Sequence, residues 1–370
     1  MSIRVAVLVP GIMGSRLFYG AGPNRQEIWG ENFARNYREI IKDPAALQWD
    51  NNPAESEPLR YVYASEASRR LRLMPRYKLW EGLLKRLRMH EEFGNTCQTW
   101  EYSYDWRQSL LVTANKFGQD LGKYTERLAV EKRVPPNEIS YVFLTHSMGG
   151  LMVRIALALG ALDPSVVDKM VHIGSPLGGS VSAFRSAYRT GSLPLMQTLY
   201  SVFKGKKNAE VFFQNFLKSV RSFPSVYQLM PPRTALPYLM YTPQNKGNPL
   251  TETVIDQRMR KHAIKAHQAL AQANQILLQR RSIRVYTIYS EYYSKPTDLE
   301  YEVQQLGPPN PGYLIKDPMP YGKTVQGDGT VSMWSAQGTD PPCLGISVTD
   351  VEHVTMCNNT KVLNRIMRVL

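Results

Sequence analysis

Short apolar runs alternate with longer amphipathic segments along most of the chain. The runs are rich in β-branched and aromatic residues and have the length of buried strands. They lie at residues 4–9, 139–144, 166–174, 283–290 and 346–351. Between them, apolar residues at helical spacing predict helices, the longest at 109–133 and 252–279. This alternation predicts an α/β fold with a mostly parallel central sheet flanked by helices.

The second of these runs leads into Thr145-His146-Ser147-Met148-Gly149-Gly150, and an apolar segment without Pro or Gly follows. A strand that turns sharply into a helix at a serine flanked by small residues is typical of the nucleophile elbow of an α/β-hydrolase. The turn would lift the Ser147 hydroxyl clear of the sheet and leave the Met148 N–H unpaired at a helix N-terminus. Thr145 replaces the first glycine of the usual G-x-S-x-G pattern, which predicts an adjusted turn. A buried turn with an incidental serine is the alternative.

A glycine-rich turn, Pro10-Gly11-Ile12-Met13-Gly14-Ser15, directly follows the first strand. It lacks the Lys-Ser/Thr pair of a P-loop and the spacing of a dinucleotide-binding loop. In an α/β-hydrolase this turn supplies the second donor of the oxyanion hole. We therefore expect the backbone N–H groups of Ile12 and Met148 to form that hole, with a plain strand-to-helix turn as the alternative.

Catalysis by a serine requires a base that takes its proton, which in this fold follows the serine and the acid along the chain. Of the four histidines after Ser147, His172 lies inside a predicted strand, where we expect it to be a core residue. His262 and His267 lie in a predicted helix at a spacing that puts them on different faces, which argues against a shared metal. His353 lies in a loop after the last predicted strand and is the expected base.

The expected acid is Asp328, which lies between two glycines in a tight turn. Four other aspartates compete for this role: Asp298, Asp317, Asp340 and Asp350. Asp350 is too near His353 in sequence to reach it from a separate strand end. The predicted catalytic triad is Ser147, Asp328 and His353.

The composition changes after residue 181. Up to residue 232, aromatic residues and methionines recur at helical spacing around the basic segment Lys204-Gly205-Lys206-Lys207. Amphipathic helices inserted between sheet strands are typical of a cap that supplies an apolar acyl pocket, although extra core packing is the alternative. We therefore expect a first part of the hydrolase core at 1–180, which includes an irregular excursion at 17–95, a helical cap or lid at 181–245, and a second part of the core at 246–370.

The net charge is +14 and the isoelectric point is near 9.6. An anionic membrane and nucleic acid are the two partner classes that such a charge suggests. No nucleic-acid-binding signature accompanies the charge, so that interpretation rests on charge alone. The basic segment 69–90 predicts a surface helix with a solvated cationic face, and attraction to anionic lipid is the alternative.

No apolar run approaches the roughly 18–20 residues of a membrane span, and the N-terminus enters a strand without a signal-peptide pattern. Cys97, Cys343 and Cys357 cannot all pair and lack metal-ligand spacing. These features predict a cytoplasmic protein, with peripheral binding at a membrane surface as an option, and neither a metal nor a cofactor.

Several segments, in this order along the chain, resemble the lecithin:cholesterol acyltransferase family, which includes lysosomal phospholipases of the A class and phospholipid:diacylglycerol acyltransferases. They are residues 9–15, Tyr104-Asp105-Trp106-Arg107, residues 146–150, Pro176-Leu177-Gly178-Gly179-Ser180, Phe223-Pro224-Ser225-Val226-Tyr227, and residues 327–331 with His353. The resemblance implies a capped α/β-hydrolase with the triad and oxyanion hole named above. It also implies action on lipid acyl esters, with the acyl group passed from serine to water or to an alcohol. Thr145, the missing signal peptide and the strong positive charge depart from the family.

The residues and the resemblance together predict a serine hydrolase that cleaves acyl esters of lipids through an acyl-serine intermediate. An acyltransferase that passes the acyl group from a phospholipid to an alcohol is the close alternative. A non-catalytic protein that retains the fold and binds membrane or nucleic acid is the distant one.

Overall fold

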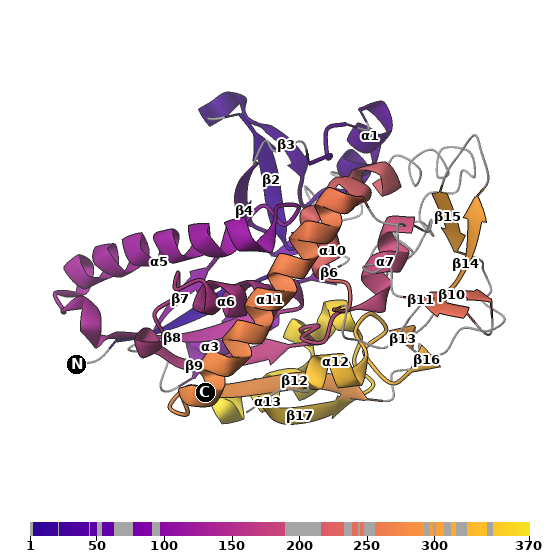
Figure 1. Ribbon diagram of the computed structural model, residues 1–370. Helices are drawn as coiled ribbons and strands as arrows, with labels where there is room; N and C mark the ends of the chain where they lie inside the picture. Colours follow the sequence, from indigo (N-terminus) through magenta and orange to yellow (C-terminus); the bar gives the residue numbers. More distant parts are fainter. Residues whose placement is uncertain are drawn as a thin grey trace.

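The computed structural model describes residues 3–20, 22–43, 45–49, 54–62, 77–90, 97–188, 216–232, 239–242, 245–247, 256–291, 297–298, 301–306, 312–315, 324–338 and 343–370. Its centre is a six-stranded sheet in the order β17-β12-β9-β8-β1-β7 (Figure 1). The strands are β1 Ile3–Val9, β7 Cys97–Glu101, β8 Ile139–His146, β9 Val167–Ile173, β12 Arg284–Glu291 and β17 Cys343–Thr349. Every neighbouring pair is parallel. The predicted fold class, a mostly parallel sheet flanked by helices, is confirmed.

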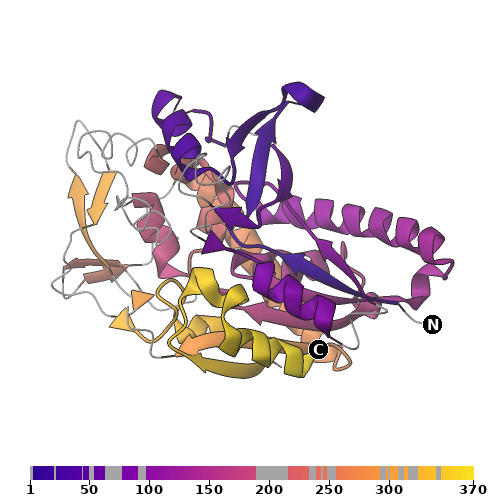
Figure 2. The ribbon, with the colours of Figure 1, turned by 180° about the vertical axis from the view of Figure 1, so that it is seen from behind.

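Helices cover both faces of this sheet, which explains why its central strands β1 and β8 are nearly continuous apolar runs. The side chains of Val5, Val7 and Val9 on β1 point to one face, toward α5 Leu110–Lys132, α6 Met148–Ala158 and α11 Gln257–Gln279. Ala6 and Leu8 point to the other face, toward α3 Glu81–Met89 and α13 Thr360–Val369. Figure 2 shows α3 and α13 side by side on that second face.

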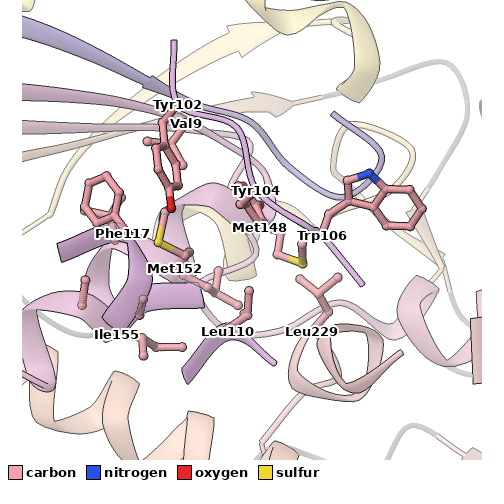
Figure 3. Close-up of a cluster of buried hydrophobic side chains, with 14 of the residues drawn as sticks. Val9, Tyr102, Tyr104, Trp106, Leu110, Phe117, Met148, Met152, Ile155 and Leu229 are labelled. Carbon is pink, nitrogen blue, oxygen red and sulfur yellow. The ribbon is translucent and has the colours of Figure 1, made fainter. Parts of the chain in front are cut away.

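The core beneath α5 and α6 is rich in aromatic residues and methionine (Figure 3). Phe117 on α5 lies edge-on to Tyr102 and Phe143, with ring centroids 4.9 and 5.9 Å apart. Met148 and Met152 on α6 are fully buried in the same cluster. The first turns of the elbow helix are therefore fixed by dense packing.

Two regular elements differ from the sequence prediction at their ends. β17 begins at Cys343, three residues before the predicted strand, and α11 begins at Gln257 because Asp256 caps it. The Asp256 carboxylate accepts the backbone N–H groups of Arg258 and Met259. The part of the predicted helix before Asp256 lies outside the described residues.

The predicted irregular excursion at 17–95 contains more structure than expected. β2 Ser15–Tyr19 pairs antiparallel with β3 Gln26–Trp29 and with β4 Glu55–Pro58, and α1 Phe33–Lys42 lies between the last two. β5 Tyr61–Val62 pairs with β6 Tyr77–Lys78. The prediction of irregular structure is wrong for these residues. The strands are short and their partners lie up to about forty residues apart, so local periodicity does not indicate them.

Of the predicted cap, the structure describes α7 Val181–Tyr188, a helical segment at 216–222, α10 Pro224–Gln228, β10 Leu239–Thr242 and β11 Asn245–Gly247. β10 and β11 form a four-stranded sheet with β14 Tyr301–Leu306 and β15 Gly312–Ile315. This small sheet lies apart from the main sheet in both ribbon views (Figures 1 and 2). The extra layer therefore includes residues after 246. The basic segments 69–76 and 204–207 lie outside the described residues.

Within the described part of the chain, helices long and apolar enough to cross a bilayer are absent.

Candidate active site

The turn between β8 and α6 holds Ser147 in an unusual backbone conformation. Its φ is +53° and its ψ is −128°, a strained combination for a residue with a side chain. The Ser147 N–H donates to the Ile173 carbonyl at 2.9 Å, which ties the turn to β9. Neighbouring glycines allow the close approach: a Cβ on Gly11 would lie 2.7 Å from Ser147 Cβ, and one on Gly149 would lie 2.4 Å from the Val9 carbonyl oxygen. This geometry is that of a nucleophile elbow.

The structure brings Ser147, Asp328 and His353 together from three distant parts of the chain. His353 Nε2 lies 2.9 Å from Ser147 Oγ, and His353 Nδ1 lies 2.7 Å from Asp328 Oδ2. All three residues are buried. A carboxylate only accepts, so Nδ1–H donates to Asp328 and the free electron pair of Nε2 accepts the Ser147 hydroxyl proton.

Asp328 is oriented by its own tight turn. Its second carboxylate oxygen accepts the N–H groups of Thr330 and Val331 at 3.0 and 2.7 Å. Its carbonyl accepts the His353 N–H at 3.1 Å, which adds a backbone link between the two residues. Of the competing acids, Asp350 is exposed and Asp298 lies in β13 Thr297–Asp298. Asp317 and Asp340 lie outside the described residues.

His146, for which the sequence predicted no role, contacts His353. Its Nε2 lies 3.0 Å from the His353 carbonyl oxygen, so Nε2–H donates there. The two rings lie 4.8 Å apart. Burial, followed by the proximity of His353, lowers the pKa of His146 to about 3. His146 is therefore a neutral residue that fixes the backbone of His353, and only its place beside Ser147 in the sequence could have signalled this.

Thr145 belongs to a second buried polar chain behind the elbow. Thr145 Oγ1 lies 2.8 Å from His172 Nδ1, and Arg154 Nε donates to His172 Nε2 at 3.1 Å. Arg154 also donates to Asn274 Oδ1 at 2.7 Å and to Cys343 Sγ at 3.0 Å. The chain joins β8, β9, α6, α11 and β17. Thr145 therefore replaces the usual glycine with a hydrogen-bonding anchor.

His172 is the core histidine that the sequence predicted. Because Arg154 can only donate, His172 Nε2 accepts and Nδ1–H donates to Thr145. Burial, then the charge of Arg154, lowers the pKa of His172 well below its ordinary value. Gly150 leaves room for this ring, because a Cβ there would lie 3.0 Å from His172 Nδ1.

The turn that carries Ile12 is held by the segment at 104–107. The Tyr104 hydroxyl donates to the Pro10 carbonyl at 2.7 Å, and Trp106 Nε1–H donates to the Ser15 carbonyl at 3.0 Å. Met13 has a φ of +63°, so the turn also carries a strained residue. Ile12 lines the cavity beside Ser147, and Met148 is the buried first residue of α6. Both expected oxyanion donors thus lie in the two turns that meet at Ser147.

The pairing of Asp105 with Arg107 is structural. Two bonds join the guanidinium to the carboxylate, at 2.9 and 2.8 Å. Arg107 also donates to the Tyr19 hydroxyl at 2.7 Å. Burial alone would lower the pKa of Arg107, but the bonds to Asp105 and Tyr19 outweigh it and the pKa is raised. The ion pair joins the small antiparallel sheet to the core.

Ser147 and His353 open into a cavity with mainly apolar walls. One wall comes from α7, α10 and the residue before α10, with Ala183, Phe223 and Val226. The other comes from Trp80 at the start of α3 and Val354 beside His353. His172, His262 and His267 do not line it. Such a cavity suits an acyl chain, with the serine hydroxyl and the imidazole as reactive groups in its wall.

A family model for lecithin:cholesterol acyltransferase matches residues 63–307. The chain belongs to the lecithin:cholesterol acyltransferase family. The resemblance found in the sequence is thereby confirmed. The family, together with the geometry of Ser147, Asp328 and His353, makes this protein an enzyme that hydrolyses or transfers the acyl groups of lipid esters.

The chain is similar to several solved structures. A structure described as the Tle4–Tli4 complex matches with a TM-score of 0.58 and 15% identity, over 99% of this chain and 98% of the other. The mature lipase BlEst2 of Bacillus licheniformis has a TM-score of 0.41 and 10% identity, over 100% and 91% of the two chains. Phospholipase PlaB of Legionella pneumophila has a TM-score of 0.36 and 11% identity, over 100% and 59%. None of the curated proteins searched matches this chain.

Proposed function

We propose that this member of the lecithin:cholesterol acyltransferase family hydrolyses acyl esters of membrane lipids, with Ser147 as nucleophile, His353 as base and Asp328 as acid. The observation that carries this proposal is the hydrogen-bonded chain Ser147–His353–Asp328 at the wall of an apolar cavity. The cavity would hold the acyl chain and present its carbonyl carbon to the serine.

In the first half of the reaction, His353 Nε2 takes the Ser147 proton as Oγ attacks the carbonyl carbon. The negative charge that develops on the carbonyl oxygen would be stabilised by the N–H groups of Ile12 and Met148. Asp328 stabilises the imidazolium that forms. When the tetrahedral intermediate collapses, His353 returns the proton to the leaving alcohol and the acyl group stays on Ser147.

In the second half, His353 takes a proton from a water molecule as that water attacks the acyl-serine. His353 then returns the proton to Ser147 Oγ as the bond to the acyl carbon breaks and the fatty acid leaves. An alcohol in place of water would give a new ester by the same steps. The cavity extends from Ser147 toward Trp80 as well as toward α10, so a second apolar molecule has a wall to bind against. Transfer to an alcohol is therefore the second candidate, as the sequence suggested.

We further propose that the enzyme meets its lipid at the surface of an anionic membrane, to which a net charge of +14 would attract it. Binding to nucleic acid is supported by the net charge alone.

Product analysis tests the proposed reaction. Wild type and Ser147→Ala are incubated with vesicles of mixed phospholipid and neutral lipid, with and without added long-chain alcohols, and products are identified by mass spectrometry. Free fatty acid that requires Ser147 supports hydrolysis, and its lipid of origin names the substrate. New esters formed in place of free acid would make transfer the main reaction. The absence of both products from the wild type contradicts the proposal.

A further inference from the structure

The first turns of α11 lie at the edge of the sheet that carries the active site. α11 leads into β12, which runs parallel to β9 and β8, so the helix runs antiparallel to the strands. Figure 1 shows α11 crossing the sheet from the side of α10 to the opposite edge. Gln228 on α10 donates to the His262 carbonyl at 3.3 Å and accepts from His267 at 3.3 Å. Residues on either side of Gln228 line the cavity, so the start of α11 supports the cavity wall.

The exposed face of α11 changes character along its length. In the first turns it carries Arg258, Lys261 and Lys265, at i, i+3 and i+7. The same face then continues with neutral side chains only: Gln268, Gln272, Gln275 and Gln279. No acidic residue occurs anywhere in Gln257–Gln279. Within Gln257–Gln279 all lysines and arginines thus lie in the first turns, at the catalytic end, and Arg280 and Arg281 follow the helix at its other end.

This arrangement does not serve the stability of the helix. The helix dipole favours anions near the N-terminus and cations near the C-terminus. Asp256 at the N-cap and Arg280 at the C-cap already supply the favourable charges, so the cations in the first turns lie at the end of the helix that the dipole disfavours. Glutamine is about as good a helix former as lysine or arginine, so propensity does not explain the change along the face. The position of the three cations at this end suits an anionic partner beside the cavity.

We infer that Arg258, Lys261 and Lys265, here called the α11 basic stripe, bind the anionic head groups of a lipid surface and hold the cavity next to it. The inference rests on the proposed function, since an apolar cavity beside a cationic face suits a substrate that combines acyl chains with anionic neighbours. Charge complementarity and the acyl cavity together favour an anionic membrane as the partner of the α11 basic stripe.

A second basic face provides a comparison. α3 carries the exposed residues Lys85, Arg86 and Arg88. α3 begins beside the cavity, where Trp80 precedes it, and these cations lie in its second half, away from the cavity. They match the α11 basic stripe in number and charge but not in position.

The test uses two triple variants with the same change in net charge. One is Arg258→Gln, Lys261→Gln and Lys265→Gln, which extends the existing glutamine face. The other is Lys85→Gln, Arg86→Gln and Arg88→Gln on α3. Both are compared with wild type in binding to vesicles of phosphatidylcholine alone or mixed with phosphatidylglycerol, in release of fatty acid from those vesicles, and in hydrolysis of a short-chain soluble ester.

We expect the α11 variant to bind the phosphatidylglycerol vesicles about 100-fold more weakly, because each cation near an anionic surface contributes about fivefold. Its release of fatty acid from these vesicles should fall in proportion, while hydrolysis of the soluble ester is retained. The α3 variant should lose little of either. Added salt should weaken wild-type binding toward that of the α11 variant.

Equal losses in both variants would show that only net charge matters, and unchanged binding of the α11 variant would assign the stripe to another anionic partner, such as an acidic protein. Either result overturns the inference. Failure of wild type to hydrolyse the soluble ester in a Ser147-dependent way would instead contradict the proposed function, so the two failures are distinguishable.

Discussion

Two histidines flank the nucleophile elbow, and the groups behind them carry opposite charges. On one side His353 contacts the Ser147 hydroxyl and is backed by the carboxylate of Asp328. On the other side His172 contacts the Thr145 hydroxyl and is backed by the guanidinium of Arg154. Both rings are buried, and each forms two hydrogen bonds to side chains.

The difference shows how one local arrangement serves either chemistry or structure. A carboxylate behind an imidazole stabilises the positive charge that the ring gains when it takes a proton. A guanidinium behind an imidazole disfavours that charge, and with burial it lowers the pKa of His172 well below the ordinary value. His353 is therefore suited to move a proton, whereas His172 is a fixed neutral anchor.

The largest expected effect comes from removing the charge of Asp328, the carboxylate behind His353. Asp328→Asn keeps the shape of the side chain but no longer holds His353 in the tautomer that accepts the Ser147 proton. We expect kcat for a soluble ester to fall about 10⁴-fold with little change in melting temperature. Asp350→Asn, at an exposed carboxylate three residues before His353, is the matched control and should retain full activity. A strong loss in the control together with a mild loss in Asp328→Asn would reassign the acid.

Substitution of Arg154, the guanidinium behind His172, should affect the stability of the fold more than its chemistry. Arg154→Met removes the donor that satisfies His172 Nε2 and Asn274 Oδ1, which leaves one buried and one half-buried acceptor unpaired. We expect the free energy of unfolding to fall by about 3 kcal/mol. Urea unfolding measures this, with Arg88→Met on the exposed face of α3 as the control. An unchanged free energy of unfolding in Arg154→Met would mean that the polar chain does not anchor the elbow.

Acid should reveal the neutral state of His172. Its pKa is lowered in the folded protein, so below about pH 6.5 the unfolded chain binds a proton that the native state does not. Stability is therefore complete above that pH and is lost as the pH falls, by up to about 1.4 kcal/mol per pH unit for each such histidine. The lowered pKa values of His146, about 3, and His267, about 4, act in the same direction.

Unfolding by urea between pH 7 and pH 5 measures this slope in wild type and in His172→Asn. The variant lacks one titrating group, so its stability should depend less steeply on pH, whatever its stability at pH 7. Identical slopes would show that His172 binds its proton at the same pH in the folded and the unfolded protein, and the contrast with His353 would not hold.

The smallest expected effect concerns Thr145. Thr145→Val keeps the size of the side chain but removes the acceptor for His172 Nδ1–H, and should lower stability by about 1 kcal/mol. Thr145→Ser keeps the hydroxyl and should restore most of that loss. Melting temperatures of both variants check this. Equal losses in the two would assign the role of Thr145 to packing of its methyl group.

Much of the core could be predicted because its signals are local. The strands β1 and β8 are nearly continuous apolar runs, since helices cover both faces of a parallel sheet. The helical spacing of apolar residues predicted the α5 helix, and Ser109 and Arg133, the ends of the predicted segment, occupy its two cap positions. The small sheet formed by β2, β3 and β4 could not, because Leu17 pairs with Ser56 across a long separation and short strands carry little periodicity.

The candidate site likewise combines residues with a local sequence signal and residues whose roles depend on distant contacts. Ser147 stands in a local motif, and chain order together with elimination pointed to Asp328 and His353, which the structure places within hydrogen-bonding distance. The roles of His146 and Thr145 depend on contacts with residues 207 and 27 positions away. Nothing local distinguishes these residues from other polar side chains in the turn. The charge change along α11 is visible in the sequence, but only the fold places its basic end at the catalytic edge.

The most direct test of the central claim is labelling of the folded protein with a fluorophosphonate, which reacts with an activated serine. Intact mass and peptide mapping then identify the modified residue. We predict one label per chain, on Ser147, absent in Ser147→Ala and strongly slowed in Asp328→Asn. A folded wild type that takes no label, or takes it on another residue, would contradict the assignment of Ser147 as the nucleophile.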